Sequence, residues 1–204
     1  VAATVGYPYD VCGAQQDDGT VCVSSTVGRN SGGFGRGGRG GRGGAAAQSY
    51  SPGGAEPGYV APDPLDPDVF FSGSNNGGFL ERLNRRTGES REVNPYPLMF
   101  SGEPSSALVE RWQWTYPIIF SPVDPTTLYV SSQRLWKTTD GGQTWTALSG
   151  DLTRHDPKTQ GKSGGPITGD MNGPEVYGVI FSVGPSKRDV NVIWTGSDDG
   201  LVSV

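Results

Sequence analysis

The clearest turn in this sequence is Thr138-Thr139-Asp140-Gly141-Gly142-Gln143-Thr144-Trp145. The Asp140 carboxylate can accept hydrogen bonds from backbone N–H groups ahead of it, and Gly141 and Gly142 tolerate positive φ. The Trp145 ring is then buried where the next strand begins. Because Asp140 is occupied in closing the turn, we interpret Thr138, Asp140, Gly142 and Trp145 as structural residues and not as catalytic ones.

The outline around this turn recurs along the chain, as a repeat protein requires. In each copy an acidic residue in a turn leads through an apolar strand to a small residue and a polar turn. Three copies keep the same interval between the acidic and the small residue: Asp66 to Gly73, Asp124 to Ser131 and Asp189 to Gly196. A fourth, partial copy covers residues 11–19, and we expect it to lack the preceding inner strand.

The copy that contains the 138–145 turn predicts a unit of four antiparallel strands. Alternation and β-branched or aromatic content place them at residues 114–120, 127–131, 134–138 and 144–148. No segment shows a sustained helical period, and 33 Gly with 16 Pro argue against helices. The sequence therefore predicts an all-β fold.

The 138–145 turn resembles an Asp box, and the chain is similar to Asp-box (bacterial neuraminidase repeat) β-propellers of the sortilin-like type and their secreted bacterial relatives, many labelled glycosyl hydrolases. The resemblance covers most of the chain outside 25–53 and rests on residues 12–19, 111–115, 135–145, 163–168 and 194–200. It implies a partial β-propeller of four-stranded antiparallel blades, about three blades plus edges. Sialidases, xyloglucanases, sortilins and plant photosystem assembly factors share the Asp box, so it specifies fold better than function.

We predict one propeller domain with five segments. Residues 1–24 form the end of a first blade, 25–55 a Gly/Arg-rich flexible insertion, 56–100 a second blade, 101–150 a third blade with the Asp box, and 151–204 a loop and the start of a fourth blade. An open propeller leaves unpaired strand edges and an uncovered blade face, which natural sheets avoid. We therefore expect a fragment whose remaining blades lie in the same polypeptide or in another chain, and which is unstable or aggregates alone.

Charge and hydropathy disfavour two classes of partner. A net charge of -5 and a pI near 4.8 argue against a general nucleic-acid or anionic-membrane binder. No apolar run approaches the length of a membrane span. We therefore expect no nucleic-acid partner and no membrane span, and nothing in the sequence predicts a cofactor or a metal site.

Residues 28–44 are rich in glycine and contain Arg29, Arg36, Arg39 and Arg42 without any acid. One interpretation is an RNA-contacting segment, since guanidinium groups pair with phosphate and stack on bases. We favour a flexible, solvated loop in place of strand four of the first blade, because the segment interrupts a repeat fold. We expect it to be the most mobile part of the chain.

Cys12 and Cys22 flank the hairpin at residues 15–19. If the hairpin is centred on Asp17, the two cysteines face one another across the strands at a separation that a disulfide can bridge. A shift of one residue breaks this pairing and leaves two free thiols as the alternative. A disulfide implies an oxidising compartment, and we expect a secreted, periplasmic or cell-surface protein.

One rim of the propeller collects a polar set of side chains. The turns between strands two and three share this rim with the connections into the next blade, while the Asp-box turn lies on the opposite rim. The candidates for ligand binding are Gln15, Gln16, Asp17, Arg111, Trp112, Gln113, Trp114, Glu175, Tyr177, Asp198 and Asp199. Carboxylates, amides, a guanidinium and aromatic faces suit a sugar or a peptide. The alternative is that they are polar only because loop tips are polar.

Two functions remain as hypotheses. The first is a non-catalytic extracellular module that binds a protein or glycan partner or packs within a surface assembly. The second is a sialidase-like or xyloglucanase-like glycoside hydrolase with a carboxylate pair drawn from Glu56, Glu175, Asp17 and Asp198. Because no carboxylate pair stands out by motif, we favour binding. His155, the only histidine, is interpreted as a surface loop residue.

Overall fold

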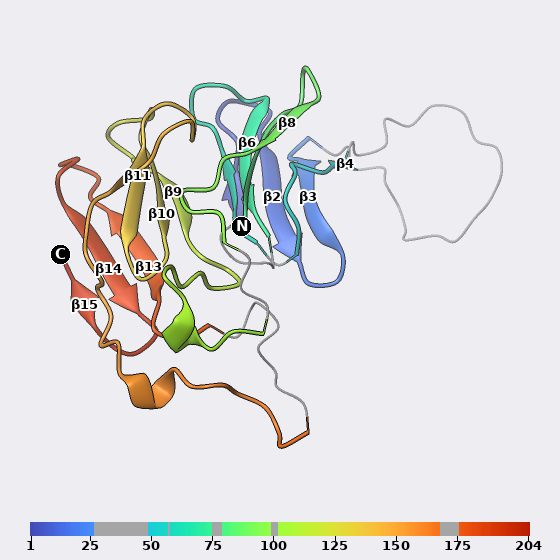
Figure 1. Ribbon diagram of the computed structural model, residues 1–204. Coiled ribbons are helices and arrows are strands. Elements are labelled where there is room, and N and C mark those ends of the chain that lie inside the picture. The colour runs from blue at the N-terminus through green and yellow to red at the C-terminus, as the bar shows by residue number, and fades with distance from the viewer. Residues whose placement is uncertain (27–48, 57, 75–78, 99–101, 168–175) are drawn as a thin grey trace.

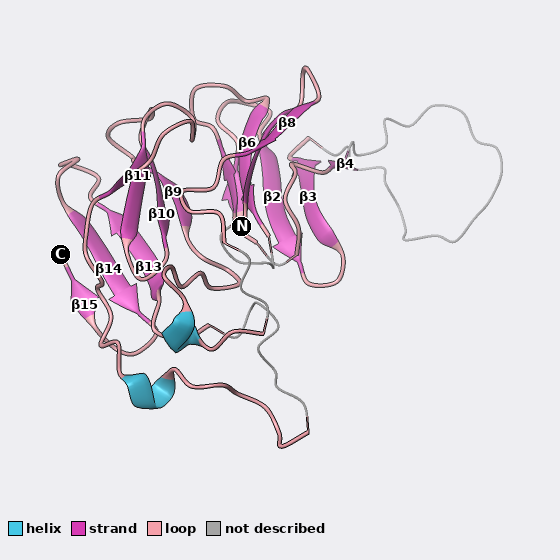
Figure 2. Cartoon of the chain, viewed as in Figure 1, coloured by secondary structure: helices cyan, strands magenta, loops and turns pink. Residues whose placement is uncertain are grey.

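The computed structural model describes residues 1–26, 49–56, 58–74, 79–98, 102–167 and 176–204. Small antiparallel sheets stand side by side as four blades of a β-propeller (Figure 1). Helical structure in these residues is confined to two short 3-10 turns, η1 (Ser105–Ala107) and η2 (Pro157–Thr159), as Figure 2 shows. The predicted all-β propeller fold is therefore confirmed.

Three blades have four strands and the last has three, and in each blade the chain order is the spatial order. Blade 1 contains β1 (Ala2–Ala3), β2 (Asp10–Gln15), β3 (Gly19–Ser24) and β4 (Ser49–Tyr50). Blade 2 contains β5 (Val60–Pro62), β6 (Val69–Gly73), β7 (Leu80–Asn84) and β8 (Glu89–Glu92). Blade 3 contains β9 (Ile118–Phe120), β10 (Leu128–Ser131), β11 (Leu135–Thr138) and β12 (Thr146–Ala147). Blade 4 contains β13 (Ile180–Pro185), β14 (Ile193–Ser197) and β15 (Val202–Ser203).

The inner strands bring the blades together. Strand β5 contacts both β1 and β9, and β13 contacts β10 of the preceding blade. An open, largely apolar cavity of about 420 Å³ lies among the inner strands of blades 1 to 3, with Val60 and Ile118 in its wall. The sheets therefore fan out from a shared centre, as the repeats predict.

Blade 1 corrects two expectations. Ala2 and Ala3 pair with Cys12 and Val11, so the first copy does have an inner strand. Within the range 25–55, predicted as an insertion in place of strand four, Tyr50 pairs with Cys22 and completes the blade. Both strands have only two residues, so no alternating pattern in the sequence marks them. The Gly/Arg-rich residues 28–44 lie outside the described residues.

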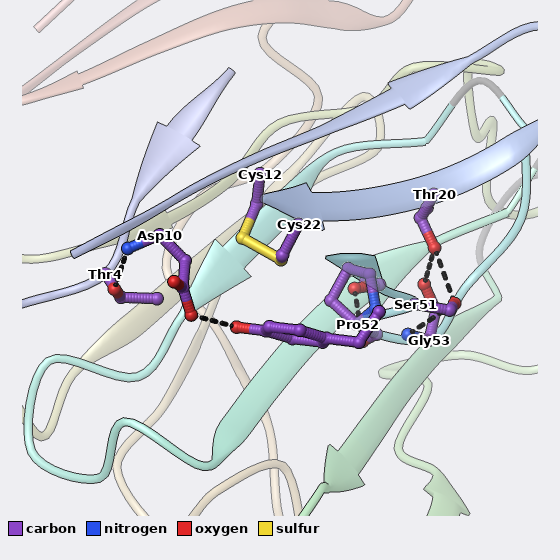
Figure 3. Close-up of a disulfide and its surroundings, with 10 residues drawn as sticks. Thr4, Asp10, Cys12, Thr20, Cys22, Ser51, Pro52 and Gly53 are labelled. Carbon is purple, nitrogen blue, oxygen red and sulfur yellow. Dashed lines mark hydrogen bonds between the residues drawn. A yellow bond between two sulfur atoms is a disulfide. The ribbon is translucent and has the colours of Figure 1, made fainter. Parts of the chain in front are cut away.

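The cysteine pair follows the predicted register. Cys12 lies directly opposite Cys22 in the β2–β3 hairpin, and the two form a disulfide (Figure 3). Both are buried against Val60 and Phe70 of blade 2, with the half-buried Tyr50 beside them. The predicted disulfide is confirmed, and it lies in the interface between blades 1 and 2.

Strand two of blade 3 sends alternate side chains to the two neighbouring blades. In β10, Leu128 and Val130 belong to the core cluster with Phe71 of blade 2. Tyr129, between them, packs with Ile180 of blade 4. Because strand side chains alternate between two faces, one short apolar run supplies two interfaces.

Candidate functional site

The 138–145 turn is closed by its own side chains. Thr138 Oγ1 accepts hydrogen bonds from the N–H groups of Asp140 (3.3 Å) and Gly142 (3.0 Å). Asp140 accepts from the Thr144 N–H at 2.9 Å and from the Thr144 hydroxyl at 2.6 Å. Hydrogen bonds from Thr144, and then from Thr138, lower the pKa of Asp140 to about 2. The carboxylate therefore holds the turn in its charged form.

The same turn fastens blade 3 to blade 2. Gly142 has φ +85°, and a Cβ there would lie 2.7 Å from the Val93 Cβ, so only glycine fits. The half-buried Trp145 donates from Nε1 to the Val93 carbonyl at 2.8 Å. Thr138, Asp140, Gly142 and Trp145 thus form one turn that docks on the neighbouring blade.

The opposite rim holds the described parts of two long connections, residues 102–117 and residues 148–167 with 176–179. Their short helical turns η1 and η2 lie at the lower end of the blades in Figure 1. At its centre is the Arg111 guanidinium, which is only 3% exposed. Nε donates to the Gly178 carbonyl at 2.7 Å, and Nη2 donates to Asp151 Oδ2 at 2.6 Å and to Thr153 Oγ1 at 3.0 Å. Arg111 therefore ties the connection into blade 3 to the connection into blade 4.

The contact between Arg111 and Asp151 changes the pKa of the Asp151 carboxyl. Burial raises its pKa, but hydrogen bonds from Thr153 and Arg111 outweigh burial and lower the pKa overall. Arg111 and Asp151 thus form an ion pair in which the guanidinium is buried and the carboxylate is about one-third exposed. Such a guanidinium has few donors left for a ligand.

The aromatic candidates next to Arg111 are largely internal. Trp112 is 0% exposed and meets Tyr116 edge to face, with ring centroids 5.2 Å apart. Gln113 donates from Nε2 to the Val176 carbonyl at 3.3 Å and accepts from the Trp114 N–H at 2.5 Å. Trp114 lies in a turn and is half-buried. Residues 111–114 therefore pack the rim from within.

The blade 4 candidates are also in contact with the rim backbone. Asp198 Oδ1 accepts from the N–H groups of Gly178 (3.1 Å) and Val179 (3.0 Å), and burial raises the pKa of this carboxyl. Asp199 Oδ2 accepts from the Arg154 N–H at 2.7 Å. Tyr177 keeps its ring partly exposed while its N–H donates to Ser105 Oγ at 3.2 Å.

The blade 1 candidates stand apart. Gln15, Gln16 and Asp17 are exposed at the β2–β3 hairpin, where Asp17 has φ 67°. Within the described part of the chain, no hydrogen bond joins these residues to 111–114 or 198–199. Glu175 lies outside the described residues. The structure thus brings Arg111, Gln113, Tyr177 and Asp198 together and leaves the hairpin separate.

Two residues of this network, Glu110 and Ser132, were not predicted. Glu110 is 2% exposed and accepts from the Ser132 hydroxyl at 2.6 Å, and its other oxygen lies 3.2 Å from Arg134 Nε. The Gln133 amide accepts from the Arg111 N–H and donates to the Val109 carbonyl. Gln133, in the turn between strands two and three, was expected on this rim and is bonded there to the connection that enters blade 3.

His155 lies in this rim too, in the connection 148–179. It is 55% exposed and its Nδ1 lies 3.6 Å from Asp151 Oδ2. This placement agrees with the interpretation of a surface loop residue. Glu56, a candidate for the carboxylate pair, is half-buried with one oxygen that has no hydrogen-bond partner.

The outer face of blade 4 exposes an aromatic side chain at a position where blades 2 and 3 bury one. Counted from the small residue of each repeat, Phe71, Tyr129 and Trp194 occupy the same position in strand two. Phe71 is 1% exposed and Tyr129 is 2% exposed, each packed on the next blade, whereas Trp194 is 55% exposed. Trp194 therefore stands on an uncovered sheet face.

Comparisons with known proteins assign no family to the chain. No model of a protein family matches the chain, and no curated protein matches it. Among solved structures the chain is similar to the GH74 xyloglucanase from Xanthomonas campestris, with a TM-score of 0.37 and 19% identity over 70% of this chain. The match spans 18% of that enzyme's chain.

Two observations bear on the compartment. Among the described residues, none of the helical segments has the length and apolar character needed to cross a bilayer. The Cys12–Cys22 disulfide is compatible with an extracellular location.

Proposed function

We propose that the chain is a non-catalytic module of an exported Asp-box β-propeller of the sortilin-like type. It packs against further blades through its outer faces and offers its polar rim to a protein or glycan partner. The observation that carries this proposal is the exposed Trp194, at a position where two other blades bury an aromatic ring under a neighbour.

The outer face of blade 4 carries apolar side chains in addition to Trp194. Val202 pairs with Gly196, and Trp194 and Gly196 share the face opposite to Ile193, which packs on blade 3. Phe181 of the neighbouring strand is also exposed. Contiguous apolar patches on soluble proteins mark interaction sites. A sheet face with this composition fits the apolar face of another blade, as in the interfaces inside this chain.

Blade 1 offers a matching face at the other side of the fan. Val11 lies opposite Val23, Val21 lies opposite Gly13, and the three valines are exposed. β-branched side chains form a flat apolar surface on a sheet, which suits packing against a second sheet about 10 Å away. The partner blades would come from the same polypeptide or from another chain.

The rim supports binding more than catalysis because its ionised groups hold loops in place. Arg111, Asp198 and Asp199 are hydrogen-bonded to backbone groups or to buried partners. A ligand on this rim would meet the exposed side chains of Gln15, Gln16, Asp17 and Tyr177. Export is supported by the disulfide, because such bonds persist in oxidising compartments.

The test is self-association of the purified chain. A chain that exposes both faces should associate through them, and Trp194→Ser should weaken association by at least about tenfold. Tyr177→Ser, which removes an exposed aromatic ring on the rim, is the matched control and should leave association unchanged. Sedimentation velocity over a range of concentrations measures the effect.

Two outcomes contradict the proposal. One is a wild-type chain that stays monomeric at high concentration. The other is turnover of aryl glycosides or polysaccharides that is lost in Glu175→Gln, because this result would identify a glycoside hydrolase.

A further inference from the structure

A polar cavity of about 270 Å³ lies between blades 2 and 3, on the side of the 138–145 turn and away from the polar rim. On the blade 2 side, one row of side chains across the sheet lines the cavity. Phe71 pairs with Arg82, and Arg82 pairs with Arg91, so the two guanidinium groups start from directly opposite positions on β7 and β8. Like charges placed directly opposite destabilise a pair of strands.

Neither arginine is committed to a strong partner. Within the described residues, the Arg82 guanidinium has no hydrogen bond or ion pair, and its Cζ lies 5.9 Å from the centre of the Phe71 ring. Arg91 pairs with Glu89 at 3.1 Å and with no other carboxylate of the described ranges, and both side chains are about half exposed. Exposed pairs of this kind contribute little and exchange easily. The row thus holds two guanidinium groups that are available to an anion.

The wall from blade 3 carries the neutral polar groups of Thr139 and Gln143 and the carboxylate of Asp140. A second carboxylate, Asp63, lines the cavity from the connection between β5 and β6 of blade 2. Asp63 Oδ1 accepts from the Leu65 N–H at 2.8 Å, so this carboxylate is fixed in position. These two negative charges disfavour a multiply charged anion such as a phosphate, and their oxygens can accept hydrogen bonds from hydroxyl groups.

We propose that this cavity is a binding site for a sugar acid, a ligand with one carboxylate and several hydroxyl groups. The carboxylate lies against Arg82 and Arg91, which suit it because guanidinium groups bind carboxylates through paired hydrogen bonds. The hydroxyl groups donate to Asp63 and Asp140 and exchange hydrogen bonds with Gln143. The site is independent of the proposed function, since it lies on neither outer face and not on the polar rim.

Isothermal titration calorimetry with sodium D-glucuronate at low salt tests the site in the purified protein. D-glucose, acetate and inorganic phosphate serve as ligands that lack the carboxylate, lack the hydroxyl groups, or carry more charge. Glucuronate should bind at least about tenfold more tightly than each of them. Arg82→Gln should weaken glucuronate binding by about tenfold or more, while Arg188→Gln, which removes an exposed arginine of the β13–β14 turn, should leave it unchanged.

A second variant protects the test against misfolding. Arg91→Gln changes an exposed side chain, and it should weaken binding while the urea midpoint stays at the wild-type value. The proposal is overturned if glucuronate gives no binding heat, if phosphate or glucose binds as tightly, or if both variants bind like the wild type.

Discussion

Blades 3 and 4 each place an aromatic ring at the same position of strand two, but the ring is buried in blade 3 and exposed in blade 4. Tyr129 of β10 is 2% exposed against blade 4, whereas Trp194 of β14 is 55% exposed. The local pattern around the two residues is the same, from the acidic turn to the small residue after the strand. The comparison teaches that the repeat encodes an interface as well as a strand, and that the neighbouring sheet determines whether the interface is formed.

The largest expected effect is the contrast between these two rings. Tyr129→Ala should lower the free energy of unfolding of the purified protein by about 3–5 kcal/mol, because it leaves a cavity between two blades. Trp194→Ala should cost under about 1 kcal/mol when the outer face is uncovered. Urea unfolding at equilibrium measures both values. Equal losses in the free energy of unfolding for the two variants would contradict the contrast between the buried and the exposed ring.

A second effect concerns how blade 3 is joined to blade 4 at the polar rim. Arg111→Ala should lower the free energy of unfolding by about 1–3 kcal/mol, since it leaves the buried Gly178 carbonyl without its donor. Arg188→Ala, at an exposed turn, should change it by less than about 0.5 kcal/mol. Urea titration gives the difference in the free energy of unfolding. An Arg111 variant as stable as the wild type would contradict a stabilising role of this guanidinium at the rim.

The smallest effect is a dependence on pH from the turn that joins blade 3 to blade 2. The folded pKa of Asp140, about 2, lies below the ordinary value of 3.8, so its contribution is present above pH 3.8 and is lost as the pH falls through 2. Asp140→Asn should therefore flatten the acid limb of the stability curve. Thermal unfolding between pH 2 and pH 5 tests this, and an unchanged slope in the variant would contradict it.

The sequence predicted most of the fold because the decisive residues act locally. The interval from Asp124 to Ser131 marks strand two, and Asp140 bonds only to its own turn. The register of Cys12 and Cys22 followed from the hairpin between them. Strands β1 and β4 were missed since a strand of two residues is too short to show an alternating pattern.

The candidate site was harder to predict because its contacts are distant in the chain. Arg111 reaches Gly178, 67 positions later, and Asp151, 40 positions later. Residue type alone presents an arginine as a possible ligand for a carboxylate, and only the folded structure reveals that Asp151 of the same chain already occupies it. Arg82 is the reverse case, since nothing in the repeat pattern distinguished it from an ordinary exposed strand residue.

The most direct measurement is hydroxyl-radical footprinting of Trp194 in the protein isolated from its natural source without denaturation. If the outer face of blade 4 is covered by another blade, Trp194 should be protected to the same degree as Tyr129, and urea should expose both together. Rapid oxidation of Trp194 in the folded protein, with Tyr129 still protected, would contradict the account.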